Sequence, residues 1–216
     1  MLTPPGVVLL QMIYNPITPG ARRYHGKVPM ELPFTDPELI WPTPLKQTLV
    51  AMFTGNKQIE IGRYSFVTAM IDSEDQNWHK DVDEPYKNFD GASTFEEVTS
   101  LPRDDPLFQI FPIPPPAPGA LVFFAIHDVA LENGPTELTC GSHIFSAVEL
   151  NDVTNNQIDA MLSFKMPLQE GDIMVMDIRT QHHGTGNKME SPRTVLYIQY
   201  VQDFFIDRGN VSSPQP

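Results

Sequence analysis

The stretch GDIMVMDIRTQHHGTGN at residues 171–187 decides the fold class. It opens with a short apolar run between Gly171 and Asp177, which has the length and composition of a buried strand rather than of a helix. A glycine-rich turn follows at Gly184 to Gly186. A short buried strand that ends in a tight turn is typical of a β-sandwich or jelly roll.

Further short strands, each bounded by turn residues, lie on both sides of this stretch. The expected strands are Ile59 to Ile71, Ala120 to Val129, Glu137 to Leu138, Leu168 to Asp177 and Thr194 to Gln202. A wound α/β sheet would need helices between them, and the sequence shows no such pattern. The chain is therefore predicted to be mainly β, a jelly roll with a few flanking helices.

One of these flanking helices is expected at Pro44 to Thr54. Thr43 can cap it, Pro44 suits its first turn, and Gly55 can end it. Its apolar face would be formed by Leu45, Leu49, Met52 and Phe53.

Composition limits the class of protein. A chain of 216 residues with 41% hydrophobic residues can build one closed core, so residues 1–216 are expected to form a single domain. The formal net charge of −13 repels nucleic acid and anionic membrane surfaces. No apolar run spans a bilayer, and the lone Cys140 excludes an internal disulfide. We expect a soluble cytoplasmic protein without a nucleic-acid or membrane partner.

A long segment at about residues 84–118 has neither a helical nor a strand period. It ends in a proline-rich patch at Pro112 to Pro118 and carries several aromatic residues that must pack on something. Loops of this length are often lids or binding loops. Two interpretations stay open, a substrate lid and a loop that covers a sheet edge.

Three residues have the chemistry of a metal site. His79 and Asp81 are two positions apart, so in an extended segment their side chains point to the same side. His182 lies far downstream, where the apolar strand gives way to the turn. Two histidines and one carboxylate are the ligand set of non-haem iron(II) oxygenases. The adjacent His183 is an alternative ligand, although alternation points it away from His182.

An arginine follows His182 closely in the sequence. Arg193 opens the apolar strand that follows His182 by eleven positions. An arginine at this place forms a surface ion pair in many proteins, but a guanidinium is also the natural bidentate partner of a buried carboxylate.

These motifs together resemble the phytanoyl-CoA dioxygenase family of iron(II)- and 2-oxoglutarate-dependent oxygenases, from about Leu45 to Gln202. The marks are Gln-x-x-His-x-Asp at Gln76 to Asp81, Glu132-Asn133-Gly134-Pro135-Thr136 followed by Gly141-Ser142-His143, Gly171-Asp172, Asp177-x-Arg179-Thr180-x-His182-x-Gly184-Thr185-x-Asn187, and Arg193. The resemblance implies a double-stranded β-helix, iron(II) at His79, Asp81 and His182, and Arg193 paired with the distal carboxylate of 2-oxoglutarate. It also implies that Gln76 and Thr136 contact this cosubstrate.

Two features depart from the family pattern. A separation of 103 positions between His79 and His182 is longer than expected, and the excess lies in the segment before Pro118. Cys140 stands where the family often has proline. These departures affect the expected substrate site rather than the metal site.

The remaining histidines and aromatic residues have ordinary structural explanations. His143 is expected to be structural, His127 a strand residue in the core or substrate site, and His25 a solvated residue of a basic loop. Trp78 is expected in the core. Asp177 and Arg179 are expected to pair with neighbours and to stiffen the turn before His182.

The expected activity is the oxidation of a small, largely apolar metabolite by iron(II), 2-oxoglutarate and dioxygen. Hydroxylation is the default outcome, with desaturation, cyclisation or epoxidation as variants. Resemblance to tailoring oxygenases of secondary metabolism points to natural-product biosynthesis and is compatible with a homodimer. Two other classes stay open. One is a cupin-like metalloenzyme that does not use 2-oxoglutarate, and the other is a non-catalytic β-sandwich binding protein.

Overall fold

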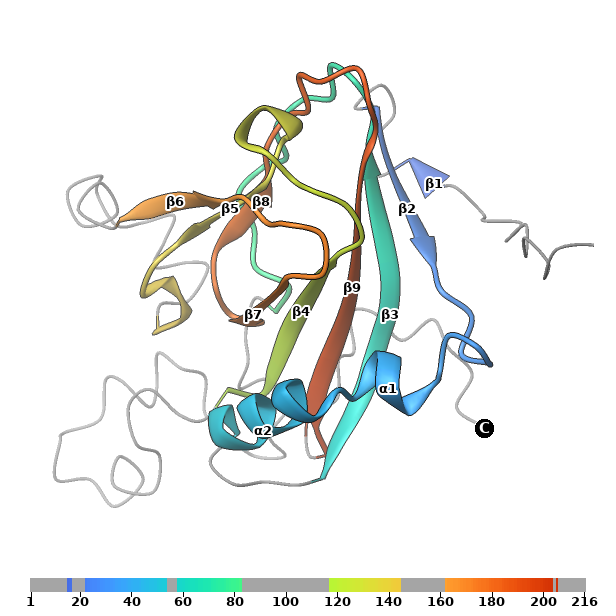
Figure 1. The fold of residues 1–216 in the computed structure, drawn as a ribbon. Helices are drawn as coiled ribbons and strands as arrows, with labels where there is room; N and C mark the ends of the chain where they lie inside the picture. The colour runs from blue at the N-terminus through green and yellow to red at the C-terminus, as the bar shows by residue number, and fades with distance from the viewer. Residues whose placement is uncertain are drawn as a thin grey trace, which may run out of the picture.

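Strand β9, Arg193–Gln202, lies inside the larger of two antiparallel sheets. The structure is a computed structural model that describes residues 15–16, 22–53, 58–82, 117–144, 162–203 and 205. The larger sheet has the order β1-β2-β3-β9-β4-β7, and the smaller has the order β6-β5-β8 (Figure 1). The other strands are β1 Asn15–Pro16, β2 Arg23–Lys27, β3 Ile59–Ala69, β4 Gly119–Ala125, β5 Thr136–Thr139, β6 Ser163–Met166, β7 Ile173–Asp177 and β8 His182–Gly184.

The two faces of the larger sheet carry different apolar clusters because side chains alternate along each strand. On one face, Ile198 and Tyr200 of β9 pack with Leu45, Leu49 and Phe53 from the helical segment. The other face carries a second cluster of buried residues, which includes Val195, Tyr197, Leu121, Phe123, Met174 and Met176. Partly buried residues pack against this cluster, among them Leu138 and Met166 of the smaller sheet and Leu168 close to it.

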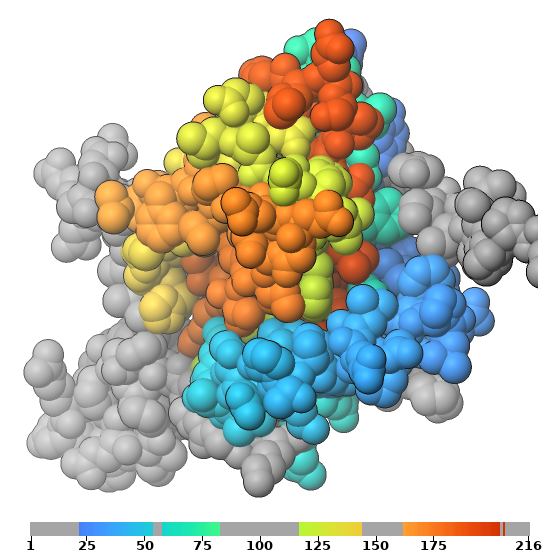
Figure 2. All heavy atoms as spheres, viewed as in Figure 1, coloured from blue at the N-terminus to red at the C-terminus, as the bar shows by residue number. Residues whose placement is uncertain are grey.

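The helices cover the first of these faces. They are α1, Pro37–Ile40, and α2, Thr43–Met52, which cross the lower part of β4, β9 and β3 (Figure 1). In Figure 2 their atoms form a layer below the atoms of residues around β6 and β7. Within the described ranges, no helix has the length and hydropathy needed to cross a bilayer.

The expected helix is confirmed, but its expected cap is wrong. Pro42 is the N-cap, Thr43 is already helical, and no side chain closes the first turn. Pro44 has no backbone N–H, so one donor fewer needs a partner there. The apolar face is as expected, because Leu45, Leu49 and Phe53 are buried.

The mainly β prediction is confirmed, with shifted strand ends. β4 ends at Ala125 and β7 begins at Ile173, because turns at 126–128 and 169–171 interrupt their pairing. Val129 and Leu168 then meet again as an isolated bridge. The turn expected at Gly184 begins later, since residues 182–184 form strand β8. Strands β2 and β6 and helix α1 were not expected.

The proposed lid at residues 84–118 lies outside the described residues, apart from Ala117 and Pro118. Its role and the single-domain organisation of residues 1–216 stay predictions.

Candidate metal centre and carboxylate site

Residues about a hundred positions apart are joined by an antiparallel run of backbone hydrogen bonds. Asp72 N donates to Asn187 O (2.8 Å), and Gln76 N donates to Gly184 O (2.9 Å). His79 and His182 then exchange two bonds, with N to O distances of 3.0 and 2.9 Å. Such a doubly bonded pair points its two side chains to the same side. The segment before Asp81 is thereby held against β8.

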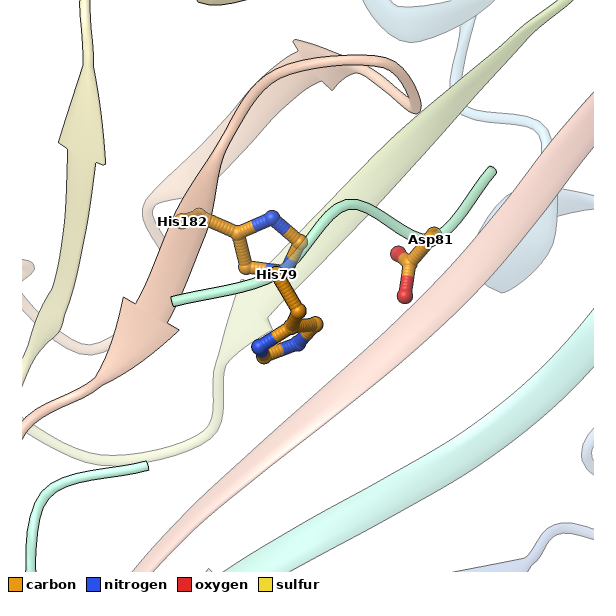
Figure 3. A group of neighbouring side chains, drawn as sticks. All are labelled: His79, Asp81 and His182. Carbon is orange, nitrogen blue, oxygen red and sulfur yellow. The ribbon is translucent and has the colours of Figure 1, made fainter. Parts of the chain in front are cut away.

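The three predicted metal ligands converge. One nitrogen from each of His79 and His182 and one oxygen of Asp81 all lie within 4.8 Å of one another. The two imidazole rings lie side by side, with centroids 4.5 Å apart, and the Asp81 carboxylate faces the same space (Figure 3). His182 is buried, whereas His79 and Asp81 are half-buried.

Backbone carbonyls select the tautomer of both histidines. His79 Nδ1 lies 2.8 Å from Asn77 O, and His182 Nδ1 lies 2.9 Å from Thr180 O. A carbonyl oxygen only accepts, so Nδ1 carries the proton in each ring. Nε2 is left with a lone pair, as metal-binding histidines require. Burial also lowers the pKa of His182, with Asp81 acting in the opposite direction, so the neutral ligand form is favoured.

Arg193 is buried without the partners that a buried guanidinium normally has. Its side chain is 2% exposed, and Nε and Nη2 have no hydrogen-bond partner among the residues that the structure describes. Burial, together with the charge of Arg23, lowers the pKa of Arg193 to about 9 from 12.5. Because the folded-state pKa is the lower one, the charged form destabilises the fold at every pH below about 9. A buried group left in this state is the expected form of an anion-binding site.

A family comparison decides the identity of this arrangement. Residues 63–195, more than half of the chain, match the profile of the phytanoyl-CoA dioxygenase (PhyH) family. The chain belongs to the phytanoyl-CoA dioxygenase family. Members of this family are oxidoreductases that use iron, 2-oxoglutarate and dioxygen. No curated protein matches the sequence.

Solved structures share the fold of this phytanoyl-CoA dioxygenase family member. The epimerase SnoN in complex with Fe3+, α-ketoglutarate and nogalamycin RO matches with a TM-score of 0.64 and 14% identity, over 96% of this chain and 78% of SnoN. AviO1 from Streptomyces viridochromogenes Tue57 matches with a TM-score of 0.54 and 19% identity, over 90% of this chain and 70% of AviO1. EvdMO1 matches with a TM-score of 0.52 and 17% identity, over 77% of this chain. The chain spans about a third of EvdMO1, 32% of its length. The double-stranded β-helix prediction is thereby confirmed.

The other family motifs build the frame around the three converging residues. Gly134 has a φ of 78°, and a Cβ there would lie 2.5 Å from Thr185 O, so glycine lets this loop approach the end of β8. Ser142 Oγ accepts from Gln181 N (2.8 Å) and donates to Thr139 O (2.7 Å). Ser142 O accepts from the buried Lys80 Nζ at 2.6 Å. The turn at Ser142 therefore contacts both the segment that carries His79 and the segment that carries His182.

The expected pairing of Asp177 with Arg179 is present. Arg179 Nη2 and Nε donate to the two carboxylate oxygens of Asp177 at 2.6 and 2.9 Å. Both side chains are largely buried. This bidentate pair stiffens the chain between β7 and His182.

The two predicted cosubstrate contacts lie beside β8. Gln76 Oε1 accepts a hydrogen bond from Gly184 N at 2.9 Å, which ties the segment before His79 to β8. Thr136 is buried in β5 opposite Gly184. A contact of either residue with 2-oxoglutarate stays a prediction.

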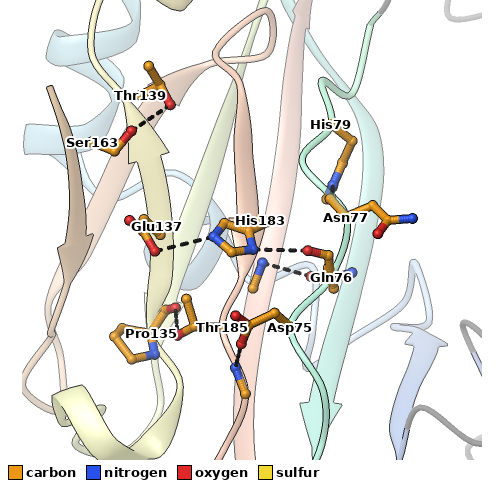
Figure 4. Close-up of polar contacts among 12 residues, drawn as sticks. Asp75, Gln76, Asn77, His79, Pro135, Glu137, Thr139, Ser163, His183 and Thr185 are labelled. Atoms are coloured by element: carbon orange, nitrogen blue, oxygen red, sulfur yellow. Dashed lines mark hydrogen bonds and ion pairs between the residues drawn. The ribbon is translucent and has the colours of Figure 1, made fainter. Parts of the chain in front are cut away.

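His183 points away from the three converging residues, between Glu137 and Gln76 (Figure 4). Its Nδ1 lies 2.9 Å from Gln76 O, and its Nε2 lies 3.3 Å from Glu137 Oε2. Both ring nitrogens are therefore engaged, so His183 is poorly placed to bind the same metal.

Three other expectations need correction. His25 is not a solvated loop residue but part of β2, and its Nε2 lies 2.9 Å from the hydroxyl of Tyr197. Trp78 is not a core residue but is 40% exposed, with its ring 4.1 Å from that of His183. His127 lies beyond the end of β4, and its Nε2 accepts from Thr194 N at 2.9 Å, next to Arg193. The three differences have separate causes: β2 is an unexpected strand, Trp78 packs beside His183, and β4 ends before His127.

Gly184 is the position where an added methyl group would disturb the site most directly. A Cβ there would lie 2.5 Å from Gln76 Oε1 and 2.9 Å from Arg23 Nη1. We expect Gly184→Ala to lower the free energy of unfolding by about 1–3 kcal/mol because both side chains must move. Urea unfolding measures this change. The control is Gly62→Ala, where a Cβ would meet Val201 Cγ1 at 3.4 Å, an ordinary contact, so this variant should be destabilised less than Gly184→Ala. Equal stability of Gly184→Ala and the wild type would contradict the packing described here.

Proposed function

We propose that His79, Asp81 and His182 bind one iron(II) ion and that Arg193 binds the distal carboxylate of 2-oxoglutarate. The observation that carries the proposal is the convergence of three ligand atoms within 4.8 Å, with both Nδ1 atoms already engaged by carbonyls. Two imidazoles and one carboxylate on one side of an ion leave positions for a chelating cosubstrate and for dioxygen.

Arg193 supports the use of a dicarboxylate cosubstrate. Among the described residues it has no ion pair, and two of its buried nitrogens lack partners. A carboxylate would supply the missing acceptors and the opposite charge at once. His127 holds the backbone at Thr194, so the start of β9 is positioned before any ligand binds.

The protein holds the reacting groups in place and keeps water away from them. Bound iron, with 2-oxoglutarate and dioxygen, supplies the oxidation of an unactivated carbon centre, with succinate and carbon dioxide as coproducts. The carbonyls of Asn77 and Thr180 orient the two imidazole rings. Asp81 fills a position that a halide would need, so we propose oxygenation rather than halogenation.

The proposed substrate is a small, largely apolar metabolite, and the outcome is hydroxylation or a related desaturation, cyclisation or epoxidation. A formal charge of −13 disfavours a polyphosphate such as a CoA thioester. The SnoN structure holds nogalamycin RO, which makes natural-product biosynthesis a reasonable setting for this chain. A cytoplasmic location and a homodimer remain parts of this proposal.

An anaerobic absorption titration tests the substrate class. Iron(II) and 2-oxoglutarate are added first, and the visible band of the complex is recorded. We expect apolar uncharged metabolites to perturb this band and acyl-CoA thioesters to leave it unchanged. A perturbation of the band by acyl-CoA thioesters, with none by the uncharged metabolites, would contradict the proposed substrate class.

A further inference from the structure

Two buried arginines lie on either side of one small residue, on the face of the larger sheet that packs against the smaller sheet. Arg23 of β2 pairs with Ala69 of β3, and Ala69 pairs with Arg193 of β9. Side chains directly opposite one another in antiparallel strands point to the same face. The side chains of Arg23 and Arg193 therefore lie on one face, separated by the methyl group of Ala69. Arg23 is 1% exposed and Ala69 is fully buried.

Only one end of the Arg23 guanidinium is satisfied by protein. Its Nη2 donates to three carbonyl oxygens, those of Glu74 (2.9 Å), Gly184 (3.3 Å) and Thr185 (3.0 Å). Its Nη1 is buried and has no hydrogen-bond partner within the described part of the chain. The three bonds to Nη2 hold the guanidinium in place, so Nη1 is fixed in its direction before a ligand binds.

The unpartnered nitrogen lies next to the strand that carries a proposed iron ligand. A Cβ on Gly184 would lie 2.9 Å from Arg23 Nη1, so the guanidinium occupies the space that a side chain at 184 would take. His182 and Gly184 face the same side of β8, one two-residue step apart, which is about 6.6 Å along a strand. Because Gly184 has no side chain, the Arg23 guanidinium can lie close to the face of β8 that carries His182.

The charges of the two arginines are not balanced by a direct ion pair among the described residues. Asp75 is the one carboxylate whose charge raises the pKa of Arg23, against the larger lowering by burial. Its Oδ1 accepts from Gly186 N at 2.6 Å. Arg193 has no carboxylate partner, and the charge of Arg23 further lowers its pKa. An anion bound between or beside the two side chains would offset both buried charges.

We propose that Arg23 is a second guanidinium for the distal carboxylate of 2-oxoglutarate and selects 2-oxo acids that carry such a carboxylate. This inference rests on the proposed function. Arg193 offers Nε and Nη2 to the carboxylate, and Arg23 offers Nη1 from the other side of Ala69. Arg23 is then a binding and specificity residue contributed by an N-terminal strand, outside the family motifs between Gln76 and Arg193.

The test compares two 2-oxo acids in Arg23→Lys. Anaerobic absorption titrations of the iron(II) protein measure Kd for 2-oxoglutarate and for its 5-methyl ester, which keeps the 2-oxo acid group for chelation but lacks the distal charge. We expect Arg23→Lys to raise Kd for 2-oxoglutarate about 10- to 100-fold and to leave Kd for the ester nearly unchanged. Arg22→Lys is the matched control, because Arg22 is exposed and pairs with Asp72, and it should change neither Kd.

Equal weakening of both ligands would overturn the proposal, since it would give Arg23 a merely structural role. A second variant keeps the test independent of the folding of Arg23→Lys. In Arg193→Gln, which leaves Arg23 in place, the preference for 2-oxoglutarate over its 5-methyl ester should persist. Its complete loss there would also overturn the proposal. A wild-type protein that binds neither iron nor 2-oxoglutarate would contradict the proposed function itself, and this inference with it.

Discussion

His182→Ala is expected to abolish iron binding and turnover while the protein stays folded. The substitution removes one of the three proposed iron ligands, whose ligand atoms converge within 4.8 Å. Changes to the outer partners of metal ligands alone typically weaken metal binding 10- to 100-fold, so loss of a ligand should exceed about 100-fold. Anaerobic titration with iron(II), followed by metal analysis of the desalted protein, measures the effect.

The neighbouring histidine provides the matched control. His183→Asn keeps a donor near the position of Nδ1, which lies 2.9 Å from Gln76 O. We expect this variant to bind one iron with nearly unchanged affinity, because His183 faces Glu137 and not Asp81. The reverse pattern, with iron lost in His183→Asn and kept in His182→Ala, would show that the wrong histidine has been assigned.

Arg193→Met is expected to change stability and cosubstrate binding in opposite directions. The substitution removes a buried charge that has no partner, so the free energy of unfolding of the apoprotein should rise by about 1–4 kcal/mol. It also removes the two charged hydrogen bonds that we propose between Arg193 and 2-oxoglutarate, each worth about 1.5–3 kcal/mol, so the affinity should fall at least about 100-fold. Urea unfolding and anaerobic 2-oxoglutarate titration measure the two effects.

The same substitution at a paired arginine should have the opposite effect on stability. Arg179 is also buried, but it forms a bidentate pair with Asp177 at 2.6 and 2.9 Å. Arg179→Met leaves that carboxylate without its partner and should destabilise the protein by about 3–5 kcal/mol. If Arg193→Met keeps full 2-oxoglutarate affinity and turnover, the protein is instead a metalloenzyme that does not use this cosubstrate.

The sequence allows the class of fold and the three converging residues to be predicted because both depend on local patterns. The short apolar runs with glycine turns set strands such as Ile173–Asp177 and Arg193–Gln202. His79 and Asp81 share a side because they are two positions apart. Alternation likewise separates His183 from His182.

Other features depend on contacts between distant segments, which no local pattern reveals. β2 has an ordinary sequence, Arg-Tyr-His-Gly-Lys, and becomes a strand because β3 offers it an edge along Arg23 to Lys27. Its alternation does place Arg23, His25 and Lys27 on one face, which is the signal that could have pointed to Arg23. Trp78 is exposed because the chain beside His79 lies on the outside of β8.

A crystal structure of the protein soaked anaerobically with iron(II) and 2-oxoglutarate tests the central claim most directly. We predict one iron bound by Nε2 of His79, Nε2 of His182 and a carboxylate oxygen of Asp81, with the distal carboxylate of 2-oxoglutarate on Arg193. Iron held by other residues, or 2-oxoglutarate bound away from Arg193, would contradict the account.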